Sequence, residues 1–438
     1  MGSRIRWLYL HLSRGDLPGT GEGRESCTAA AGRAGLPAKW GSCTMKNLFV
    51  QWGGGNIGRS FIAQVFSRAG CRVVIIDINQ ALVDALNTQH SYTVETVFDQ
   101  DVQHLLIGDV SAVHASDQEA INQALADADL LGISVGRGAW PHIAASLAKA
   151  IIFRHEQKPE SPLDIILAEN IHACRQFAKD LLIPHLGNHV DADAYLGLAQ
   201  TSIGKMVPIQ DPTKLLVVRS EPYNELIVDR EAFHHPLPSF ADIHPVAPIE
   251  AYVDRKLFIH NMGHSTTAYL GFALHPECAT IAQVLEDTSI RDEVRRAMQQ
   301  SRDVLLALHP SVFSKEELDA HIEDLLTRFS NHALGDTVHR VGRDLERKLR
   351  YDDRLLGIII EAERMGKGWD AIGRAYLKAL SFTAKDSEGR AYPQDLAFLQ
   401  SLASIGWPEK LCKASSWEEG DLEISLCMKI AKQLQAME

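Results

Sequence analysis

The chain has 438 residues, enough for two or three domains. Its 44 Lys and Arg against 56 Asp and Glu give a net charge of -12, which argues against nucleic acid as a partner. No apolar run reaches the roughly 20 residues that a membrane span needs. The seven cysteines are scattered, odd in number and without a C-x-x-C pair. This pattern favours a reducing, cytoplasmic protein with free thiols and no cysteine-built zinc site.

Residues 1–44 differ in character from the rest of the chain. They are rich in Gly, Arg, Ser and Ala and lack sustained periodicity, and the apolar stretch at 7–10 is too short for a signal-peptide core. Met45 directly precedes the apolar run 46–50, which is how many Rossmann domains begin. We therefore expect Met45 to be the natural start and residues 1–44 to be a disordered or non-native extension.

Strands and helices alternate between residues 46 and 135. The pattern predicts strands at 46–51, 72–77 and 129–135, and helices at 56–69, 79–88 and 117–127. The first strand runs into a turn with the spacing G-x-G-x-x-G, and a helix follows, which is the dinucleotide-binding fingerprint. The expected cofactor-binding positions in this turn are Gly53, Gly55, Asn56, Ile57 and Gly58.

Asp77 ends the second strand about 20 residues after the fingerprint, where a carboxylate accepts hydrogen bonds from both ribose hydroxyls of NAD and repels a 2′-phosphate. Ile78 and Asn79 follow, with no arginine to bind such a phosphate. The pattern therefore favours NAD over NADP. The alternative interpretation is that Asp77 is an ordinary turn residue at a strand end.

Polar or turn residues also end two further predicted strands. The strand 130–136 ends in Gly136, and the strand 164–170 ends in Glu169 and Asn170. Ligands of open parallel sheets bind outside the carboxyl ends of the strands, so we expect these three residues near the cofactor or substrate. Weaker patterns near 92–97 and 103–107 complete a doubly wound sheet of about six strands, which runs to about residue 195.

The character changes to helical after about residue 210. Periodicity predicts helices at 251–270, 280–285, 289–308, 315–329, 337–348, 353–365, 369–380, 394–403 and 421–436. The proline-containing stretch 221–250 is predicted to connect the two parts. The fold class is therefore α/β, with an N-terminal Rossmann-type doubly wound domain at 45–205 and a mainly α-helical substrate domain at 206–438.

Lys256, Asn261 and His264 form the pattern K-x4-N-x2-H in an apolar, helix-compatible run. On an α-helix their side chains fall within an arc of about 140°. Burial disfavours the ammonium form of a lysine and lowers its pKa toward the range where the amine can take a proton. An amide and an imidazole on the same face could hold an oxygen-bearing carbon beside it. The constellation predicts general-base catalysis on an alcohol or ketone.

The basic run at 339–350 allows two interpretations. A charge run on a helix is usually a solvated face. Beside an active site in an acidic chain, the same run could bind an anionic substrate, since Arg makes bidentate contacts with phosphate or carboxylate and Lys makes a point-charge contact. The residues alone leave both interpretations open.

Together these motifs resemble the polyol-specific long-chain dehydrogenase family, from about Met45 to the C-terminus. The segments that carry the resemblance are 53–59, 86–92, 169–170, 255–258, 261, 263–264, 268–271, 340–343 and 347–349. The resemblance implies metal-free chemistry, with a lysine in place of the zinc or tyrosine of other alcohol dehydrogenases. The implied reaction is the NAD-dependent interconversion of D-mannitol 1-phosphate and D-fructose 6-phosphate.

The same resemblance implies roles for individual residues. Lys256 looks like the base that accepts the hydroxyl proton as hydride leaves for NAD. Asn261 and Asn170 look like the amides that stabilise the developing alkoxide, and His264 is similar to the family histidine that orients the substrate. The residues implied to hold distal substrate oxygens or a phosphate are Arg340, Arg343 and Lys348.

One segment departs from the family pattern. Where members carry V-D-R-I-x-P, this chain has Ile203–Pro208, in which the carboxylate is lost and the arginine has become lysine. The departure leaves open a dehydrogenase of another polyol, pentitol phosphate or sugar acid, and also a non-catalytic NAD-binding sensor. The expected partner is a small sugar alcohol or ketose, bound by a monomer or weak oligomer.

Overall fold

A computed structural model of the protein describes residues 47–171, 173–208, 210–417 and 424–438. All of them belong to one compact unit, Ser42–Glu438. The expectations for residues 1–44 and for Met45 as the start lie outside the described residues. Within the described ranges, no helix combines the length and the apolar character needed to cross a membrane.

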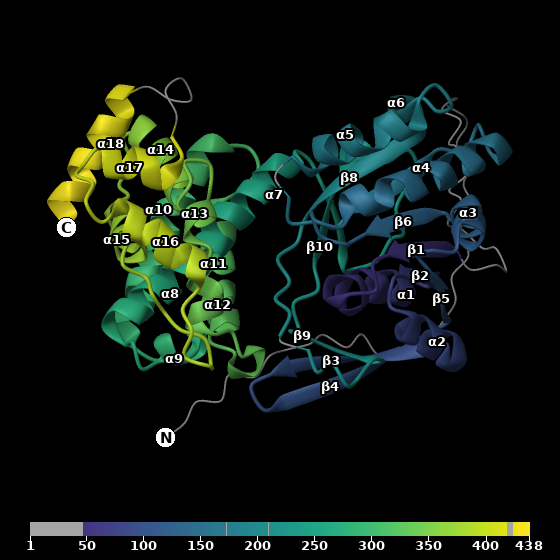
Figure 1. The fold of residues 1–438 in the computed structure, drawn as a ribbon, viewed down its shortest axis with the longest axis horizontal. Coiled ribbons are helices and arrows are strands. Elements are labelled where there is room, and N and C mark those ends of the chain that lie inside the picture. Colours follow the sequence, from purple (N-terminus) through teal and green to yellow (C-terminus); the bar gives the residue numbers. More distant parts are fainter. Residues whose placement is uncertain (1–46, 172, 209, 418–423) are drawn as a thin grey trace, which may run out of the picture. The chain divides into compact units, whose positions relative to one another are not determined.

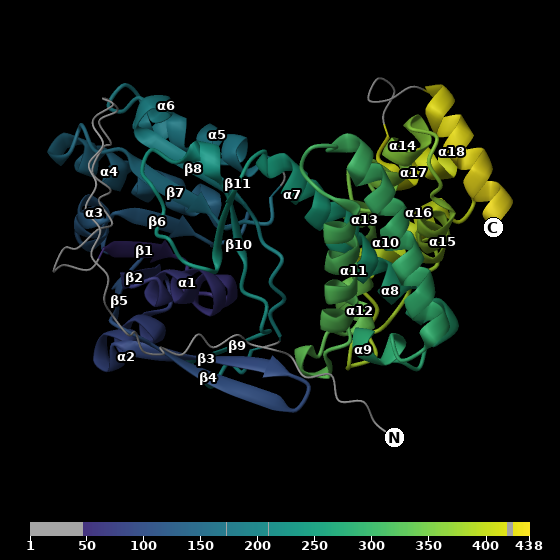
Figure 2. The same ribbon diagram turned by 180° about the vertical axis from the view of Figure 1, so that it is seen from behind.

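The first half of the described chain forms an eight-stranded sheet (Figures 1 and 2). In spatial order its strands are β11 Ile243–Val246, β10 Leu226–Asp229, β8 Leu196–Ser202, β7 Leu163–Leu167, β6 Leu130–Ile133, β1 Leu48–Trp52, β2 Arg72–Asp77 and β5 Val110–His114. From β8 to β5 all pairs are parallel, whereas β10 runs antiparallel to β8. The predicted doubly wound Rossmann-type sheet is confirmed.

Helices cover both faces of the parallel strands, because successive side chains of a strand point to opposite sides. These helices are α1 Gln64–Arg68, α2 Gln80–Gln89, α3 Gln118–Asp127, α4 Trp140–Gln157, α5 Cys174–Leu186 and α6 Ala192–Tyr195. Val50 and Trp52 of β1 share a core with α3, α4 and α5. Phe49 faces the other way and stacks on Phe66 of α1, with ring centroids 4.2 Å apart. The strand that leads into the glycine turn is thus buried on both faces.

A second, three-stranded sheet stands apart from the first. Strands β3 (Ser91–Phe98) and β4 (Asp101–Gly108) form an antiparallel hairpin, and β9 (Val217–Ser220) pairs parallel with β3. The sequence predicted both hairpin strands, but their inclusion in the parallel sheet was wrong. A two-residue turn can join only antiparallel neighbours, whereas a parallel strand needs a crossover connection.

The main sheet continues beyond residue 205, where the sequence pattern suggested that the first domain ends. Strands β10 and β11 lie within the stretch 221–250 that was predicted as a connection. The helical half begins at Ile249, within the last two residues of this stretch.

The second half is helical, as predicted. Its helices are α7 Ile249–Arg255, η3 Lys256–Asn261, α8 Met262–Leu274, α9 Ile281–Val284, α10 Thr288–Leu308, α11 Lys315–Phe329, α12 Val338–Gly342, α13 Leu345–Lys348, α14 Leu356–Arg364, α15 Asp370–Ala379, α16 Pro393–Leu402, α17 Glu409–Ser415 and α18 Ile424–Met437. Helix α8 is buried along most of its length. A Cβ on Gly263 would lie 2.7 Å from the Met298 sulfur, and one on Gly271 would lie 2.4 Å from Val284. The glycines therefore let α9 and α10 fix α8 in the core.

Two local deviations from regular helix bear on the site. The predicted single helix at 337–348 was wrong, because the chain breaks between α12 and α13, where Asp344 has a φ of 74°. The predicted helix at 251–270 is present but contains the π-helical turn η3. A second π turn, η1 (Gly58–Ala63), follows the glycine fingerprint. π turns are rare in proteins overall, but those that occur are often at functional sites. Both η3 and η1 coincide with a sequence motif.

Gly58 and Gly55 should differ sharply in their tolerance of a methyl group. A Cβ on Gly58 would lie 1.9 Å from the Gly53 carbonyl oxygen, whereas nothing lies within 4 Å of one on Gly55. Gly58→Ala should lower the free energy of unfolding by about 3 kcal/mol or more, because backbone must move. Gly55→Ala should lower it by less than about 1 kcal/mol. Urea denaturation measures both values, and equal losses would contradict this account of the turn.

Candidate active site

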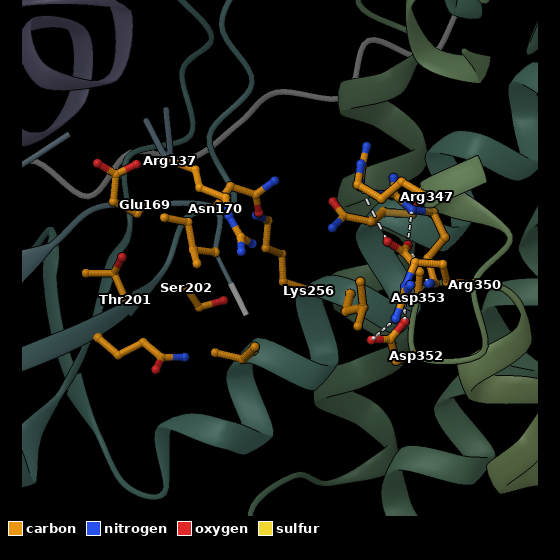
Figure 3. A pocket seen from close by; sticks show the side chains of 16 residues that line it. Arg137, Glu169, Asn170, Thr201, Ser202, Lys256, Arg347, Arg350, Asp352 and Asp353 are labelled. Carbon is orange, nitrogen blue, oxygen red and sulfur yellow. Dashed lines mark hydrogen bonds and ion pairs between the residues drawn. The ribbon is translucent and has the colours of Figure 1, made fainter. Parts of the chain in front are cut away.

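A cavity of about 250 Å³ lies where the carboxyl ends of β6, β7 and β8 meet the start of the helical half. Residues from both halves line it: Arg137, Glu169, Asn170, Ile171, Gln200, Thr201, Ser202, Val253, Lys256, Leu257, Asn261, Arg347, Arg350, Asp352, Asp353 and Arg354. Figure 3 shows Lys256 between the residues of the strand ends on one side and the arginine and aspartate side chains on the other.

Lys256 meets a neutral partner across the cavity. Its Nζ donates a hydrogen bond of 2.5 Å to Oδ1 of Asn170, which follows β7. Enclosure by the protein lowers the pKa of Lys256 to about 8, and the positive charge of Arg354 contributes to this lowering. The side chain is half-buried by surface area, so solvent still reaches it from the cavity. The structure therefore brings together a lysine that can exist as the free amine and an amide from the other half.

The π turn η3 aligns Lys256 with Asn261. On a regular α-helix these two positions would diverge by about 140°. A π turn forms hydrogen bonds between residues five apart, which stacks such positions on one face. Both side chains consequently line the same cavity. The backbone carbonyl of Asn261 lies 3.5 Å from Nη1 of Arg354.

His264 lies deeper than the other two residues of its motif and does not line the cavity. Its ring stacks on Phe329 with centroids 4.7 Å apart, and its Nε2 lies 3.3 Å from the Asp336 carboxylate. Burial lowers the pKa of His264 to about 3, and Arg340 adds to this effect. The imidazole is therefore neutral and held by its neighbours.

Glu169 lines the cavity, but its carboxylate is engaged. It accepts hydrogen bonds from the backbone N–H groups of Val135 and Gly136, at 2.8 and 3.0 Å, and from Nε1 of Trp140. Burial raises the pKa of Glu169 despite these bonds. The residue thus fixes the loop that follows β6, with Gly136 in the left-handed region at a φ of 79°.

The glycine turn has the geometry of a pyrophosphate cradle. Gly53 has a φ of 96°, and a Cβ there would lie 2.5 Å from the Ser134 carbonyl oxygen. Gly55 and Asn56 are exposed and Ile57 is half-buried, so the backbone of the turn is open to a ligand. Space for a further group remains at Gly55, because no atom lies within 4 Å of the position that a Cβ would take there.

Asp77 contacts the same turn. Its carboxylate accepts hydrogen bonds from the backbone N–H groups of Gly54, at 2.7 Å, and Asn79, at 2.8 Å. Arg59 fixes the other side of the turn, because its Nε donates to the Gly54 carbonyl at 2.6 Å. The glycine turn and Asp77 come together at the carboxyl ends of β1 and β2, whereas Gly136 and Glu169, also predicted to bind the dinucleotide, lie after β6 and β7.

The basic run divides over several environments because of the helix break at Asp344. Arg340 forms an ion pair with Asp336, which also contacts His264. The Arg343 guanidinium lies over the Tyr392 ring, and Lys348 is buried with its Nζ donating 2.7 Å to the Val341 carbonyl. These three predicted substrate residues do not line the cavity.

Other arginines take part in the cavity instead. Arg347 and Arg350 line it from α13 and the residues just after it, and Arg354 precedes α14. The lining contains Arg137, Lys256 and these three arginines, against Glu169, Asp352 and Asp353. An excess of cationic groups in a chain of net charge -12 suits an anionic ligand.

The segment that departs from the family pattern lies close to Lys256. The Gly204 carbonyl accepts a hydrogen bond of 2.5 Å from Arg328, and Gly204 lines a small second cavity together with Lys256 and His260. Lys205 is buried, and its Nζ donates to the Tyr223 carbonyl at 2.7 Å. Burial lowers the pKa of Lys205 to about 7. The lysine therefore has a local structural partner.

Thr201, Ser202, Arg137 and Arg354 are among the cavity-lining residues that sequence reasoning did not assign to the site. Thr201 and Ser202 end β8, so the rule that ligands bind at strand ends would have found them if that strand had been predicted. Arg137 directly follows Gly136, so its position at the end of a predicted strand could have marked it in the same way. Arg354 had no signal in the sequence, because only the folded chain brings it beside Asn261.

Comparisons with known proteins agree with this architecture. Residues 47–241 match the family model of the mannitol dehydrogenase Rossmann domain, and residues 248–435 match that of the mannitol dehydrogenase C-terminal domain. The fold and site define a two-part Rossmann dehydrogenase of the polyol class. The chain belongs to the mannitol dehydrogenase family.

Several relatives share most of the chain. A mannitol-1-phosphate 5-dehydrogenase of Brevibacillus brevis is 33% identical over 369 residues, which cover 83% of this chain and 92% of the relative. One of Pyricularia oryzae is 34% identical over 358 residues, covering 80% and 87%. Among solved structures, Pseudomonas fluorescens mannitol 2-dehydrogenase in complex with NAD and D-mannitol matches with a TM-score of 0.63 at 16% identity, covering 90% of this chain and 95% of that one. A D-sorbitol dehydrogenase matches with a TM-score of 0.72 at 14% identity, covering 90% and 93%. These structural matches support the fold.

Proposed function

We propose that the protein interconverts D-mannitol 1-phosphate and D-fructose 6-phosphate with NAD as the cofactor. The observation that carries the proposal is the half-buried Lys256, with a pKa of about 8, in a cavity rich in arginine at the carboxyl ends of the parallel strands. The names of the relatives at 33–34% identity support the phosphorylated substrate. We also propose a cytoplasmic location and expect a monomer or weak oligomer.

The residues that would hold the cofactor are those of the glycine turn and Asp77. A bound nicotinamide supplies hydride acceptance in one direction and hydride donation in the other. The N–H groups of Gly53 and Gly54 are occupied, so the exposed backbone from Gly55 onward would face a pyrophosphate. The Asp77 carboxylate has further lone pairs for ribose hydroxyls, and its charge disfavours a 2′-phosphate.

In this proposal Lys256 takes the proton of the reacting hydroxyl when the polyol is oxidised and returns it when the ketose is reduced. Asn170 accepts from Lys256 through Oδ1, which leaves its amide N–H groups able to donate. These donors and the Asn261 amide would stabilise the developing alkoxide. The neutral His264 stacks on Phe329 and lies 3.3 Å from Asp336, which pairs with Arg340; because neither His264 nor Arg340 lines the cavity, both would act on the substrate only through neighbouring residues.

We assign the phosphate group of the substrate to Arg347 and Arg350. Both line the cavity, and their side chains are 48% and 39% exposed, so they can reach a ligand. Arg350 pairs with Asp352 at 2.9 Å, an exposed ion pair that costs little to exchange for a phosphate. This assignment replaces Arg343 and Lys348, whose side chains point to other partners.

A second candidate function is the oxidation of another polyol or its phosphate. Gly204 favours it, because a glycine stands beside Lys256 where the family pattern has a carboxylate. A pocket wall without that side chain could accept a sugar with a different arrangement of hydroxyl groups.

The first test is NADH oxidation with fructose 6-phosphate and fructose side by side, followed by absorbance. We expect turnover of the phosphate and little turnover of the free sugar. Lys256→Met should lower kcat by about 100-fold or more, because the base is lost, while the exposed variant Lys149→Met keeps full activity. Turnover of neither sugar by the native chain would contradict the proposed substrate and favour the second candidate.

The phosphate assignment predicts different effects of two arginine variants. Arg350→Ala should raise KM for fructose 6-phosphate by about tenfold, the equivalent of one charged hydrogen bond. Its effect on the free sugar should be small. Arg343→Ala should change neither value, because this side chain lies over Tyr392 and outside the cavity. Steady-state kinetics on both substrates measure these effects. If only Arg343→Ala raised KM for fructose 6-phosphate, Arg343 and not Arg350 would be the phosphate-binding residue.

Asp77→Asn tests the cofactor preference with little change in shape. The amide keeps an oxygen for one of the two backbone N–H groups, that of Gly54 or that of Asn79, and loses the negative charge. The ratio of kcat/KM for NADPH to that for NADH should rise by about tenfold, because a like-charge contact with the 2′-phosphate disappears. Asp127→Asn, an exposed position at the end of α3, serves as the control. An unchanged ratio would show that Asp77 only supports the turn.

A further inference from the structure

Arg354 occupies a position that neither the motif nor the family pattern assigned. It lies just before α14 and lines the cavity with Lys256 and Asn261. Its side chain is 11% exposed, far less than those of Arg347 and Arg350 in the same cavity. A guanidinium in such a place needs fixed partners.

Asp353 supplies the anchor. Its Oδ1 accepts hydrogen bonds from the backbone N–H of Arg354, at 2.6 Å, and from Nε of the same residue, at 2.8 Å. Its Oδ2 lies 3.4 Å from Nη1 of Arg347. The other end of the Arg354 guanidinium reaches the Asn261 carbonyl at 3.5 Å. Arg354 therefore joins the loop before α14 to the π turn that carries Lys256.

The charges around Lys256 give this contact an electrostatic consequence. The titratable and charged groups that face the region are Arg137, Glu169, Arg255, His260, His264, His321, Arg347, Arg350, Asp352, Asp353 and Arg354. Burial lowers the pKa of His260 and of His321, so both are neutral near pH 7. The carboxylates are occupied: Glu169 by backbone N–H groups, and Asp352 and Asp353 by arginines.

Lys256 is consequently left with a neutral hydrogen-bond partner and a neighbouring cation. We propose that Arg354 is a positioning residue for the reaction, which lines the cavity beside Lys256, holds the Asn261 carbonyl and disfavours the ammonium form of Lys256 by like-charge repulsion. The inference rests on the proposed function, in which Lys256 is the base. Arg354 is also the charged group that adds to burial in lowering the pKa of Lys256 to about 8.

The two directions of the reaction depend on pH in opposite ways. Polyol oxidation needs the free amine, so its rate rises as the pH passes the pKa of Lys256. Ketose reduction needs the ammonium form, so its rate falls over the same range. Loss of the Arg354 charge stabilises the ammonium and raises the pKa, which moves both midpoints to higher pH.

Arg354→Gln is the decisive variant, because the amide can still donate to Asp353 and Asn261 without carrying a charge. We expect the midpoints of both pH–rate profiles to rise by about one unit. Arg354→Lys restores a cation and should return them toward the native value. Arg364→Met, at the far end of α14 in an ion pair with Glu361, should leave the profiles unchanged. Arg354→Met replaces the glutamine variant if circular dichroism shows that the latter does not fold.

A second measurement does not depend on turnover. Cyanate reacts with free amines, so the pH dependence of carbamylation at Lys256, measured by peptide mass spectrometry, reports the state of that amine directly. A raised midpoint in Arg354→Gln and a native one in Arg354→Lys would support the inference. Lower kcat at every pH with unmoved profile and labelling midpoints would overturn it. If the native chain oxidises no polyol phosphate, the proposed function fails, while the labelling midpoints still decide the role of Arg354.

Discussion

The site depends on one constraint: the Lys256 amine has no carboxylate as its hydrogen-bond partner. It lies between the carboxyl edge of a parallel sheet and a buried helix. A carboxylate beside Lys256 would favour the ammonium ion and remove the lone pair that a base needs. The Asn170 oxygen, 2.5 Å from Nζ, gives the lysine a hydrogen bond without that charge. Asn170 comes from the sheet and Lys256 from the helical half, so this hydrogen bond forms only when the two halves pack in the right relative position. The packing of α8 against α9 and α10 at Gly263 and Gly271 secures one side of this meeting.

The parts of this arrangement that were predictable from sequence are those in which one position admits one kind of residue. The backbone at Gly58 leaves no room for a Cβ, so only glycine fits there, and the fingerprint glycine can be recognised from the sequence. Glu169 and Asn170 were found because parallel strands bring their carboxyl ends to one edge. The roles differ in detail, since the Glu169 carboxylate binds the loop after β6. Its buried position could not be read from the strand pattern.

Other features depend on tertiary packing and left no signal of their own. Helical periodicity is the same for an α-helix with and without one π turn, so the alignment of Lys256 with Asn261 was not foreseeable. The run 339–350 looks continuous, yet Asp344 adopts a left-handed conformation, and its N–H donates to the buried carboxylate of Asp395 at 2.9 Å. A contact 51 positions away thus divides the basic run. That division separates Arg343 from Arg347 and decides which arginines reach the cavity.

Cationic side chains in the cavity serve two needs that would conflict if one group had to meet both. A phosphate bound directly to the charge beside Lys256 would neutralise that charge and return the lysine to its ammonium form. In an extended sugar phosphate the carbonyl lies near one end of the carbon chain and the phosphate lies at the other. Arg354, enclosed and tied to Asp353, can therefore act on the lysine, while the more exposed Arg347 and Arg350 would bind the phosphate of the proposed substrate. The difference in exposure among the three arginines would let one cavity attract an anion and also disfavour the ammonium form of the proposed base.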